Sequence, residues 1–154
     1  MTDKLNTKFP INWIIKNKLA VGKYPNNQED LELLKKKGIK SILNLCTEEE
    51  APIPIGLLGN FEFFRYPLPD HKVKKKLEEF EILEVIEVVE KLLKNGPIFI
   101  HCYASIERSP FVCIAWLVLK ENIAFLNALD HVKQSHELSN PIKGHLNLLM
   151  NLNV

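Results

Sequence analysis

A histidine and a cysteine end a short apolar run, and an arginine follows six positions after the cysteine. The segment reads His101-Cys102-Tyr103-Ala104-Ser105-Ile106-Glu107-Arg108-Ser109. Because residues 97–100 look like a buried strand and residues 111–119 like an apolar helix, the sulfur is expected in a tight turn between them. Backbone N–H groups and the positive end of a helix dipole favour anions there, including a thiolate. The segment therefore predicts a nucleophile that attacks phosphate esters.

Arg108 supplies the second part of the expected chemistry. Its guanidinium is a rigid two-pronged donor that matches two phosphate oxygens and stabilises charge in a transition state. The backbone N–H groups of residues 103–108 are expected to surround the phosphate oxygens. The predicted substrate-binding residues are Tyr103, Ala104, Ser105, Ile106, Glu107 and Arg108. The simpler alternative is a buried cysteine at a strand end with an ordinary surface arginine.

The elements that must position this segment alternate between strands and helices. Strands are expected near residues 13–15, 19–22, 39–45, 61–66 and 97–100, and helices near 27–37, 77–94, 111–119, 123–135 and 141–149. The first two strands form either a hairpin or two edge strands. The alternation predicts an α/β fold with a mainly parallel central sheet flanked by helices on both faces, in a single domain over residues 1–154. In such sheets ligands bind beyond the carboxyl ends of the strands.

The pattern of His101, Cys102, five residues, Arg108 and Ser109 resembles the signature of cysteine-dependent protein phosphatases, in particular the dual-specificity branch. The resemblance covers residues 11–149. It implies hydrolysis of phosphotyrosine, phosphoserine and phosphothreonine in proteins through a cysteinyl-phosphate intermediate, with no metal and no cofactor. The chain departs from the family at Ser105 and Glu107, where glycine is usual or common. Glycine serves where a backbone needs unusual dihedrals, so Ser105 is expected to strain the loop.

The resemblance also implies roles for three residues beside the nucleophile. Asp70 lies in a proline-rich loop after a strand, where the family has its general acid and base, although an aspartate after proline is also ordinary turn chemistry. Ser109 is implied to help release the thiolate, and a helix cap is the alternative. His101 is implied to orient Cys102 through hydrogen bonding, which a purely structural histidine would also fit.

Two further residues, Cys46 and Arg65, are expected near the edge of the sheet that carries Cys102. Cys46 ends the strand at 39–45, and if that strand neighbours the Cys102 strand, a reversible Cys46–Cys102 disulfide would protect the thiolate from overoxidation. The alternative for Cys46 is a small buried hydrophobic residue. Arg65 is expected to be either a second phosphate contact or a member of a structural ion pair.

Composition sets limits on partners and location. The chain has 154 residues and a formal net charge of +1, so it has no overall charge that would attract nucleic acid or a membrane. Lysines at positions 72, 74, 75 and 76 are expected at a helix start, either to steer phosphorylated substrates or as a solvated face. Three cysteines and a polar segment at 1–8 predict a reducing compartment. We therefore expect a cytoplasmic monomer that binds phosphorylated proteins, without nucleic acid and without membrane insertion.

Two alternatives to a protein phosphatase stay open at this point. The same scaffold can act on a phosphoinositide, an RNA 5′-phosphate or another small phosphate, but Tyr103 and Glu107 lack the positive charge that such substrates favour inside the loop. The other alternative is a phosphate-binding module whose catalysis is lost through Ser105 and Glu107. Turnover of para-nitrophenyl phosphate would separate an enzyme from such a module.

Overall fold

The computed structural model describes residues 8–152, and its five strands form one sheet in the order β1-β2-β5-β3-β4. The strands are β1 (Asn12–Ile15), β2 (Leu19–Gly22), β3 (Ser41–Asn44), β4 (Glu62–Arg65) and β5 (Ile98–His101). β1 and β2 are antiparallel, and all other neighbours are parallel. The predicted hairpin is thus confirmed. The alternative of two edge strands is wrong, because β2 lies inside the sheet between β1 and β5.

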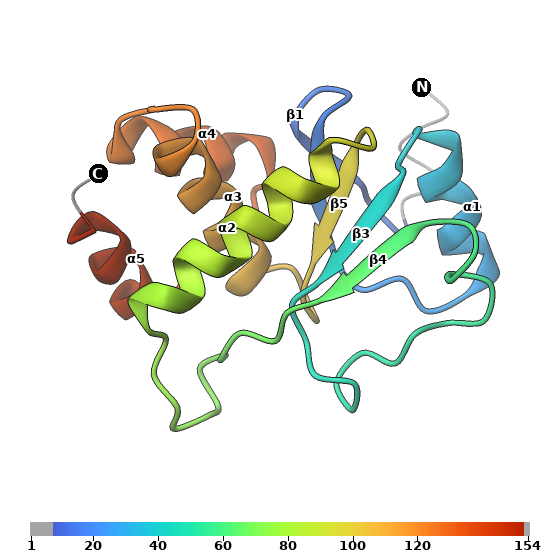
Figure 1. Ribbon diagram of the computed structural model, residues 1–154, viewed down its shortest axis with the longest axis horizontal. Coiled ribbons are helices and arrows are strands. Elements are labelled where there is room, and N and C mark those ends of the chain that lie inside the picture. Colours follow the sequence, from blue (N-terminus) through green and yellow to red (C-terminus); the bar gives the residue numbers. More distant parts are fainter. Residues whose placement is uncertain (1–7, 153–154) are drawn as a thin grey trace.

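Helices cover both faces of this sheet, as Figure 1 shows. They are α1 (Gln28–Lys36), α2 (Glu79–Leu93), α3 (Arg108–Leu119), α4 (Phe125–Ser135) and α5 (Lys143–Met150). α1 packs on one face, and the other four helices lie on the opposite side. The predicted α/β fold with a mainly parallel sheet is therefore confirmed. Among the described residues, no helix is both long enough and apolar enough to cross a membrane.

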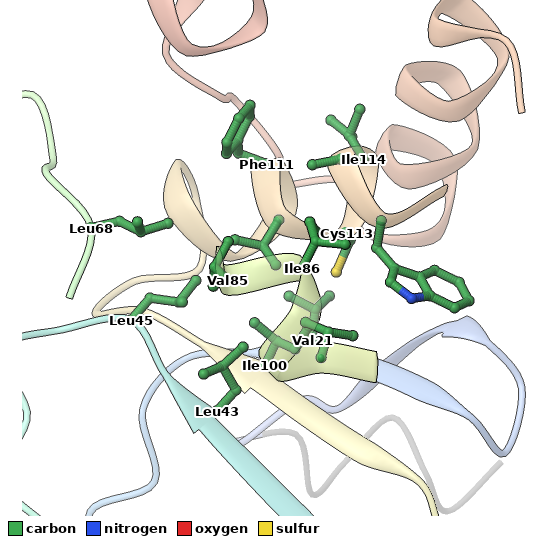
Figure 2. Packing of buried hydrophobic residues seen from close by; sticks show 14 of the residues in the cluster. Val21, Leu43, Leu45, Leu68, Val85, Ile86, Ile100, Phe111, Cys113 and Ile114 are labelled. Carbon is green, nitrogen blue, oxygen red and sulfur yellow. The ribbon is translucent and has the colours of Figure 1, made fainter. Parts of the chain in front are cut away.

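The core consists of two layers of side chains because successive residues of a strand point to opposite faces. One layer joins the central strands to α2 and α3, and Figure 2 shows Val21, Leu43, Ile100, Ile86 and Ile114 within it. The other layer joins the same strands to α1 through Ala20, Ile42, Phe99, Leu31 and Leu34. The three central strands are buried over their whole length, which fixes the strand ends that carry the polar residues.

The ends of α1 follow the signals in the sequence. The side chain of Asn27 accepts a hydrogen bond from the backbone N–H of Asp30 at 2.9 Å, as expected of a helix cap. Gly38 follows the helix with a φ of +85°, a conformation that glycine adopts without a steric cost. The helix predicted at 27–37 is therefore confirmed.

The start of α2 differs from the sequence prediction for the lysines at 72–76. The helix begins at Glu79, so the lysines at 72–76 lie in the preceding loop and not at the helix start.

Two apolar residues of α2, Phe80 and Leu83, have helical spacing but are 53% and 48% exposed. The buried apolar residues of the helix are Ile82, Val85, Ile86, Val89 and Leu92. Two apolar stripes overlap on this helix, and only contact with the sheet decides which one is buried.

Candidate active site

The polar residues predicted from the sequence meet at the carboxyl ends of β3, β4 and β5. Cys102 follows β5 directly and lines a cavity of about 850 Å³. Arg108 and Asp70 line the same cavity, although they come from α3 and from the loop after β4. Of the predicted substrate-binding residues, all but Ser105 line it; the others are Tyr103, Ala104, Ile106, Glu107 and Arg108. The structure thus brings the expected nucleophile, phosphate ligand and acid together.

In the loop between β5 and α3, residues 102–107, three carbonyl groups are hydrogen-bonded by other segments of the protein. The carbonyl oxygens of Tyr103, Ser105 and Ile106 accept hydrogen bonds at 3.4, 2.6 and 2.7 Å from Tyr24 N–H, His136 Nε2 and Asn140 N–H respectively. Within residues 8–152, no protein group accepts from the backbone N–H groups of residues 103–107. These N–H groups are therefore available to an anion, as in other backbone anion sites.

Ser105 has a backbone conformation that L residues rarely adopt. Its φ is +60°, in the left-handed region, where a side chain costs energy and glycine does not. The strain expected from a serine at this position is therefore present. The Ser105 side chain is buried and points inward, because its hydroxyl lies 3.0 Å from the hydroxyl of Ser109.

Ser109 is the second residue of α3 and lies against the nucleophile. Its Oγ is 3.3 Å from the sulfur of Cys102. The residue that precedes the helix as N-cap is Glu107, and it makes no side-chain capping bond. The helix-cap alternative for Ser109 is therefore wrong, and its hydroxyl is in position to donate to a thiolate.

The guanidinium of Arg108 is buried and held by three segments. Nη2 and Nη1 donate to the two carboxylate oxygens of Glu50, at 2.8 and 3.2 Å. Nη1 also donates to the carbonyl oxygens of Leu45 and Leu68, at 3.3 and 3.2 Å. This ion pair fixes the orientation of the guanidinium toward the cavity. Glu50 lies between β3 and β4 and is not among the site residues that the sequence predicts.

The loop that carries Asp70 is tied to the phosphate-binding loop. Asp70 accepts a bond from the backbone N–H of Lys72 at 2.9 Å, so its carboxylate also closes a local turn. The neighbouring ring of His71 lies 2.8 Å from a carboxylate oxygen of Glu107. Glu107 thus has a hydrogen-bonding partner on the Asp70 loop. Lys72 and Lys75 also line the cavity.

The family model of the dual specificity phosphatase catalytic domain matches residues 19–154. The chain belongs to the dual-specificity phosphatase family. It is 27% identical to mouse dual specificity protein phosphatase 2 over 82% of this chain and 38% of the relative. It is 31% identical to human dual specificity protein phosphatase 7 over 73% of this chain and 26% of the relative. The chain therefore spans well under half the length of these curated relatives.

Solved structures of dual-specificity phosphatases and related proteins share the fold. Tk-PTP in the active form superposes with a TM-score of 0.78 at 19% identity, over 92% of this chain and 95% of that one. The human tyrosine phosphatase-like serine/threonine/tyrosine-interacting protein gives a TM-score of 0.77 at 22% identity, over 92% and 94%. At these identities the superpositions establish the fold alone.

His101 and Cys46 occupy buried positions next to the nucleophile of this dual-specificity phosphatase family member. Burial lowers the pKa of His101 to about 4, so its ring is neutral, and its Nδ1 lies 3.0 Å from the carbonyl oxygen of Cys102. β3 does neighbour β5, as the redox hypothesis for Cys46 requires. Burial raises the pKa of the Cys46 thiol to about 12, which disfavours the thiolate that disulfide exchange uses.

Arg65 holds the loop that supplies Glu50. Its guanidinium donates to the carbonyl oxygens of Cys46 and Ala51 at 2.9 and 3.2 Å. Neither of the two expected roles fits, because its partners in the described part of the chain are backbone carbonyls and not a carboxylate, and it does not line the cavity. The second arginine of this phosphatase family member therefore supports the first one through the loop 46–51.

Replacing Glu50 by glutamine is expected to destabilise the protein in a pH-dependent way. Burial opposes ionisation of this carboxylate, but hydrogen bonds from Arg108 and Thr47 outweigh it and lower its pKa. A lowered pKa stabilises the fold above the ordinary glutamate pKa, and this stabilisation is lost as the pH falls through the lowered value. We expect E50Q to cost about 1–2 kcal/mol at pH 7. Urea unfolding at pH 7 and below pH 4 measures both effects.

The matched control for this prediction is E49Q. Glu49 is exposed in the same acidic run and makes no contact with Arg108. Its substitution is expected to change the free energy of unfolding by less than about 0.5 kcal/mol. Equal destabilisation by the two variants would contradict a specific Glu50–Arg108 pair.

Proposed function

We propose that this chain hydrolyses phosphotyrosine, phosphoserine and phosphothreonine in proteins through a phosphorylated Cys102. The observation that carries the proposal is the loop at 102–107. The carbonyl groups of Tyr103, Ser105 and Ile106 are bound by the surrounding protein, and the N–H groups of residues 103–107 have no protein acceptor within the described residues. In this proposal the free N–H groups bind the phosphate oxygens above the sulfur, together with Arg108, which borders the same cavity.

In the first proposed step, the thiolate of Cys102 attacks phosphorus. An S–P bond forms as the bond between phosphorus and the substrate oxygen breaks, and the electron pair of that bond goes to the oxygen. Asp70 gives its proton to this leaving oxygen. The loop N–H groups and Arg108 bind the phosphate oxygens, where negative charge is greatest in the transition state.

In the second proposed step, water attacks the phosphocysteine. Asp70, now ionised, accepts a proton from the water as its oxygen bonds to phosphorus. The S–P bond breaks and its electron pair returns to sulfur, where the hydroxyl of Ser109 donates a hydrogen bond to the thiolate. Phosphate leaves and the enzyme is regenerated without a metal or a cofactor.

Replacing Asp70 by asparagine is expected to slow hydrolysis most for substrates with a strongly basic leaving oxygen. We expect kcat/KM to fall about a hundredfold for a phosphoserine peptide, because general acid catalysis contributes on that scale. The fall should be about tenfold or less for para-nitrophenyl phosphate, whose leaving group is a weak base. Steady-state kinetics with both substrates provides the comparison.

D130N is the control for D70N. Asp130 lies on α4, and its carboxylate bonds to Gln134 and does not line the cavity. Both substrates should be hydrolysed at the wild-type rate by this variant. An equal loss for both substrates in D70N, or no loss, would argue that Asp70 only closes its turn with Lys72.

A non-protein phosphate is the second candidate substrate. Lys72 and Lys75 line the cavity and would favour a highly anionic ligand. PTPMT1, solved in complex with PI(5)P, shares the fold with a TM-score of 0.76 at 14% identity. Glu107 opposes this candidate, because it lines the same cavity with a carboxylate. A panel of phosphopeptides and phosphoinositides ranks the two classes by kcat/KM, and we expect the phosphopeptides to rank first.

A phosphate-binding module without turnover is the candidate from another functional class. The Ser105 strain favours it, since a loop held in a costly conformation can lose its catalytic geometry. Cys102, Arg108 and Asp70 nevertheless line one cavity, so no group that the reaction needs is missing. We therefore expect turnover of para-nitrophenyl phosphate, and inorganic phosphate binding without turnover would establish the module.

The remaining proposals concern the protein as a whole. We propose that residues 1–154 form one catalytic domain that acts as a monomer on phosphorylated proteins in the cytoplasm.

A reversible Cys46–Cys102 disulfide also stays a prediction. Its test is mass spectrometry after mild peroxide treatment, in which the C46A variant should lose the disulfide and gain higher oxidation states of Cys102.

A further inference from the structure

A chain of two hydrogen bonds leads from Ser105 to the nucleophile. The Ser105 hydroxyl oxygen lies 3.0 Å from that of Ser109, which in turn lies 3.3 Å from the sulfur of Cys102. All three side chains are buried, with exposed fractions of 1%, 0% and 2%. The contacts therefore lie in the protein interior, where hydrogen bonds are stronger than in water.

Hydrogen counting gives this chain a direction. A thiolate can only accept, so Ser109 must donate its single hydroxyl hydrogen to sulfur, and Ser105 must then donate to Ser109. In the opposite direction the Ser105 hydrogen would need another acceptor. Within residues 8–152, the only hydrogen-bond partner of the Ser105 hydroxyl is the hydroxyl of Ser109. Both hydroxyl hydrogens, those of Ser105 and Ser109, therefore have an acceptor only when the chain donates toward the thiolate.

The backbone of Ser105 is fixed by residues outside the catalytic segments. Its carbonyl oxygen can only accept, so Nε2 of His136 carries a hydrogen and donates to it at 2.6 Å. The other ring nitrogen, Nδ1, lies 2.7 Å from the Asn12 side-chain amide, which donates to it when the ring is neutral. His136 directly follows α4 as its C-cap residue, and Asn12 begins β1. These contacts support the left-handed conformation that directs the Ser105 side chain inward.

We propose that Ser105 is a positioning residue that acts on Cys102 through Ser109. Its hydroxyl orients and polarises the Ser109 hydroxyl, which then binds the thiolate more strongly before attack and as it leaves the phosphocysteine. The inference rests on the proposed function for its effect on turnover, but its effect on the free thiolate can be measured without turnover. It gives a reason for a serine at a position where its backbone conformation is costly.

The first test is the pH dependence of Cys102 alkylation by iodoacetamide. Removal of a donor to the thiolate disfavours ionisation, so the midpoint of the rate profile is expected to rise by about half a pH unit in S105G, a threefold effect. S105A is expected to give the same rise, because it removes the hydroxyl and keeps the Cβ. C102S provides the blank for the two other cysteines, which are fully buried.

The other groups around the sulfur are common to all these variants. The titratable and charged residues that interact with Cys102 or share its cavity are Cys46, Glu50, Asp70, His71, Lys72, Lys75, His101, Glu107, Arg108 and Cys113. None of them is substituted in S105G or S105A. A change in the midpoint therefore reports on the hydroxyl chain.

The same alkylation experiment in an S109A protein shows whether Ser105 acts on Cys102 through Ser109. In S109A the sulfur has lost its direct donor, so adding S105G is expected to leave the midpoint where S109A alone puts it. An equal rise in both backgrounds would overturn the proposal. So would a rise in S105G that is absent in S105A, because it would come from backbone freedom and not from the hydroxyl.

The kinetic test uses para-nitrophenyl phosphate under pre-steady-state conditions. At a pH well above the alkylation midpoints of both proteins, a poorer thiolate leaving group slows hydrolysis of the phosphocysteine, so S105G is expected to lower kcat about threefold, keep kcat/KM and produce a burst of nitrophenol. Loss of kcat/KM without a burst would overturn this role. If wild type shows no turnover, the proposed function fails, and the alkylation profiles still decide the role of Ser105.

Discussion

Replacement of Cys102 by serine is expected to abolish hydrolysis of para-nitrophenyl phosphate, with a loss of at least about a thousandfold in kcat. A hydroxyl is far weaker as a nucleophile than a thiolate at neutral pH. Binding should survive, because the loop N–H groups and Arg108 stay in place around the cavity. We therefore expect C102S to bind inorganic phosphate in calorimetry as the wild type does, while product release from the substrate falls to the background rate.

C113A is the control for this prediction. Cys113 lies in α3 and is fully buried in the core layer that the sheet, α2 and α3 share, as Figure 2 shows. Its replacement removes a sulfur from the interior without altering the cavity, so the cost should be in stability and not in kcat. Retention of more than about a tenth of wild-type kcat by C102S would rule out a cysteinyl-phosphate intermediate.

The parts of the site that the sequence predicts are those that lie close together in the chain. The strand at 98–101, the loop and α3 are contiguous, so composition and the six-residue spacing place the sulfur beside Arg108. Parallel strands also bring their carboxyl ends to one edge of the sheet. That rule alone places the Asp70 loop near Cys102. The observed ends of the helices and strands differ by a few residues from the predicted ends, because capping contacts and the final helical turns determine where an element stops.

The parts that the sequence does not predict are contacts between distant residues. Glu50 is 58 positions from Arg108, and His136 is 31 positions from Ser105 and 124 from Asn12. Three consecutive glutamates after β3 signal an acidic partner for an arginine, but spacing does not show which one reaches it. Glu50 is the glutamate that reaches Arg108, because hydrogen bonds from Arg65 and Thr47 hold the loop 46–51 in its conformation.

These distant contacts have a common physical role. Each one constrains a group whose intrinsic preference differs from what the site needs: a long guanidinium with many rotamers, and a serine with positive φ. Pre-organisation of this kind lets donors face the reacting phosphate without reorganisation during the reaction. Sequence motifs therefore locate the chemistry, and the supporting residues set how well it is oriented.

Replacing Arg108 by lysine is expected to lower kcat/KM by about a thousandfold while the positive charge is retained. A lysine has a single ammonium at the end of a flexible chain. It cannot contact both oxygens of Glu50 and still present two parallel donors to a phosphate. We expect KM to rise and kcat to fall together, because in the proposed mechanism the guanidinium binds phosphate oxygens in the ground state and in the transition state. Steady-state kinetics and phosphate calorimetry measure the two losses.

R65K is the matched comparison, because it makes the same chemical change at the only other arginine. Arg65 contacts the carbonyls of Cys46 and Ala51, so its replacement acts on the site only through the Glu50 loop. We expect a loss of about tenfold or less in kcat/KM. A similarly small loss in R108K would show that Arg108 serves mainly as the structural partner of Glu50. The backbone N–H groups would then have to carry phosphate binding alone, and E50Q would leave catalysis unchanged.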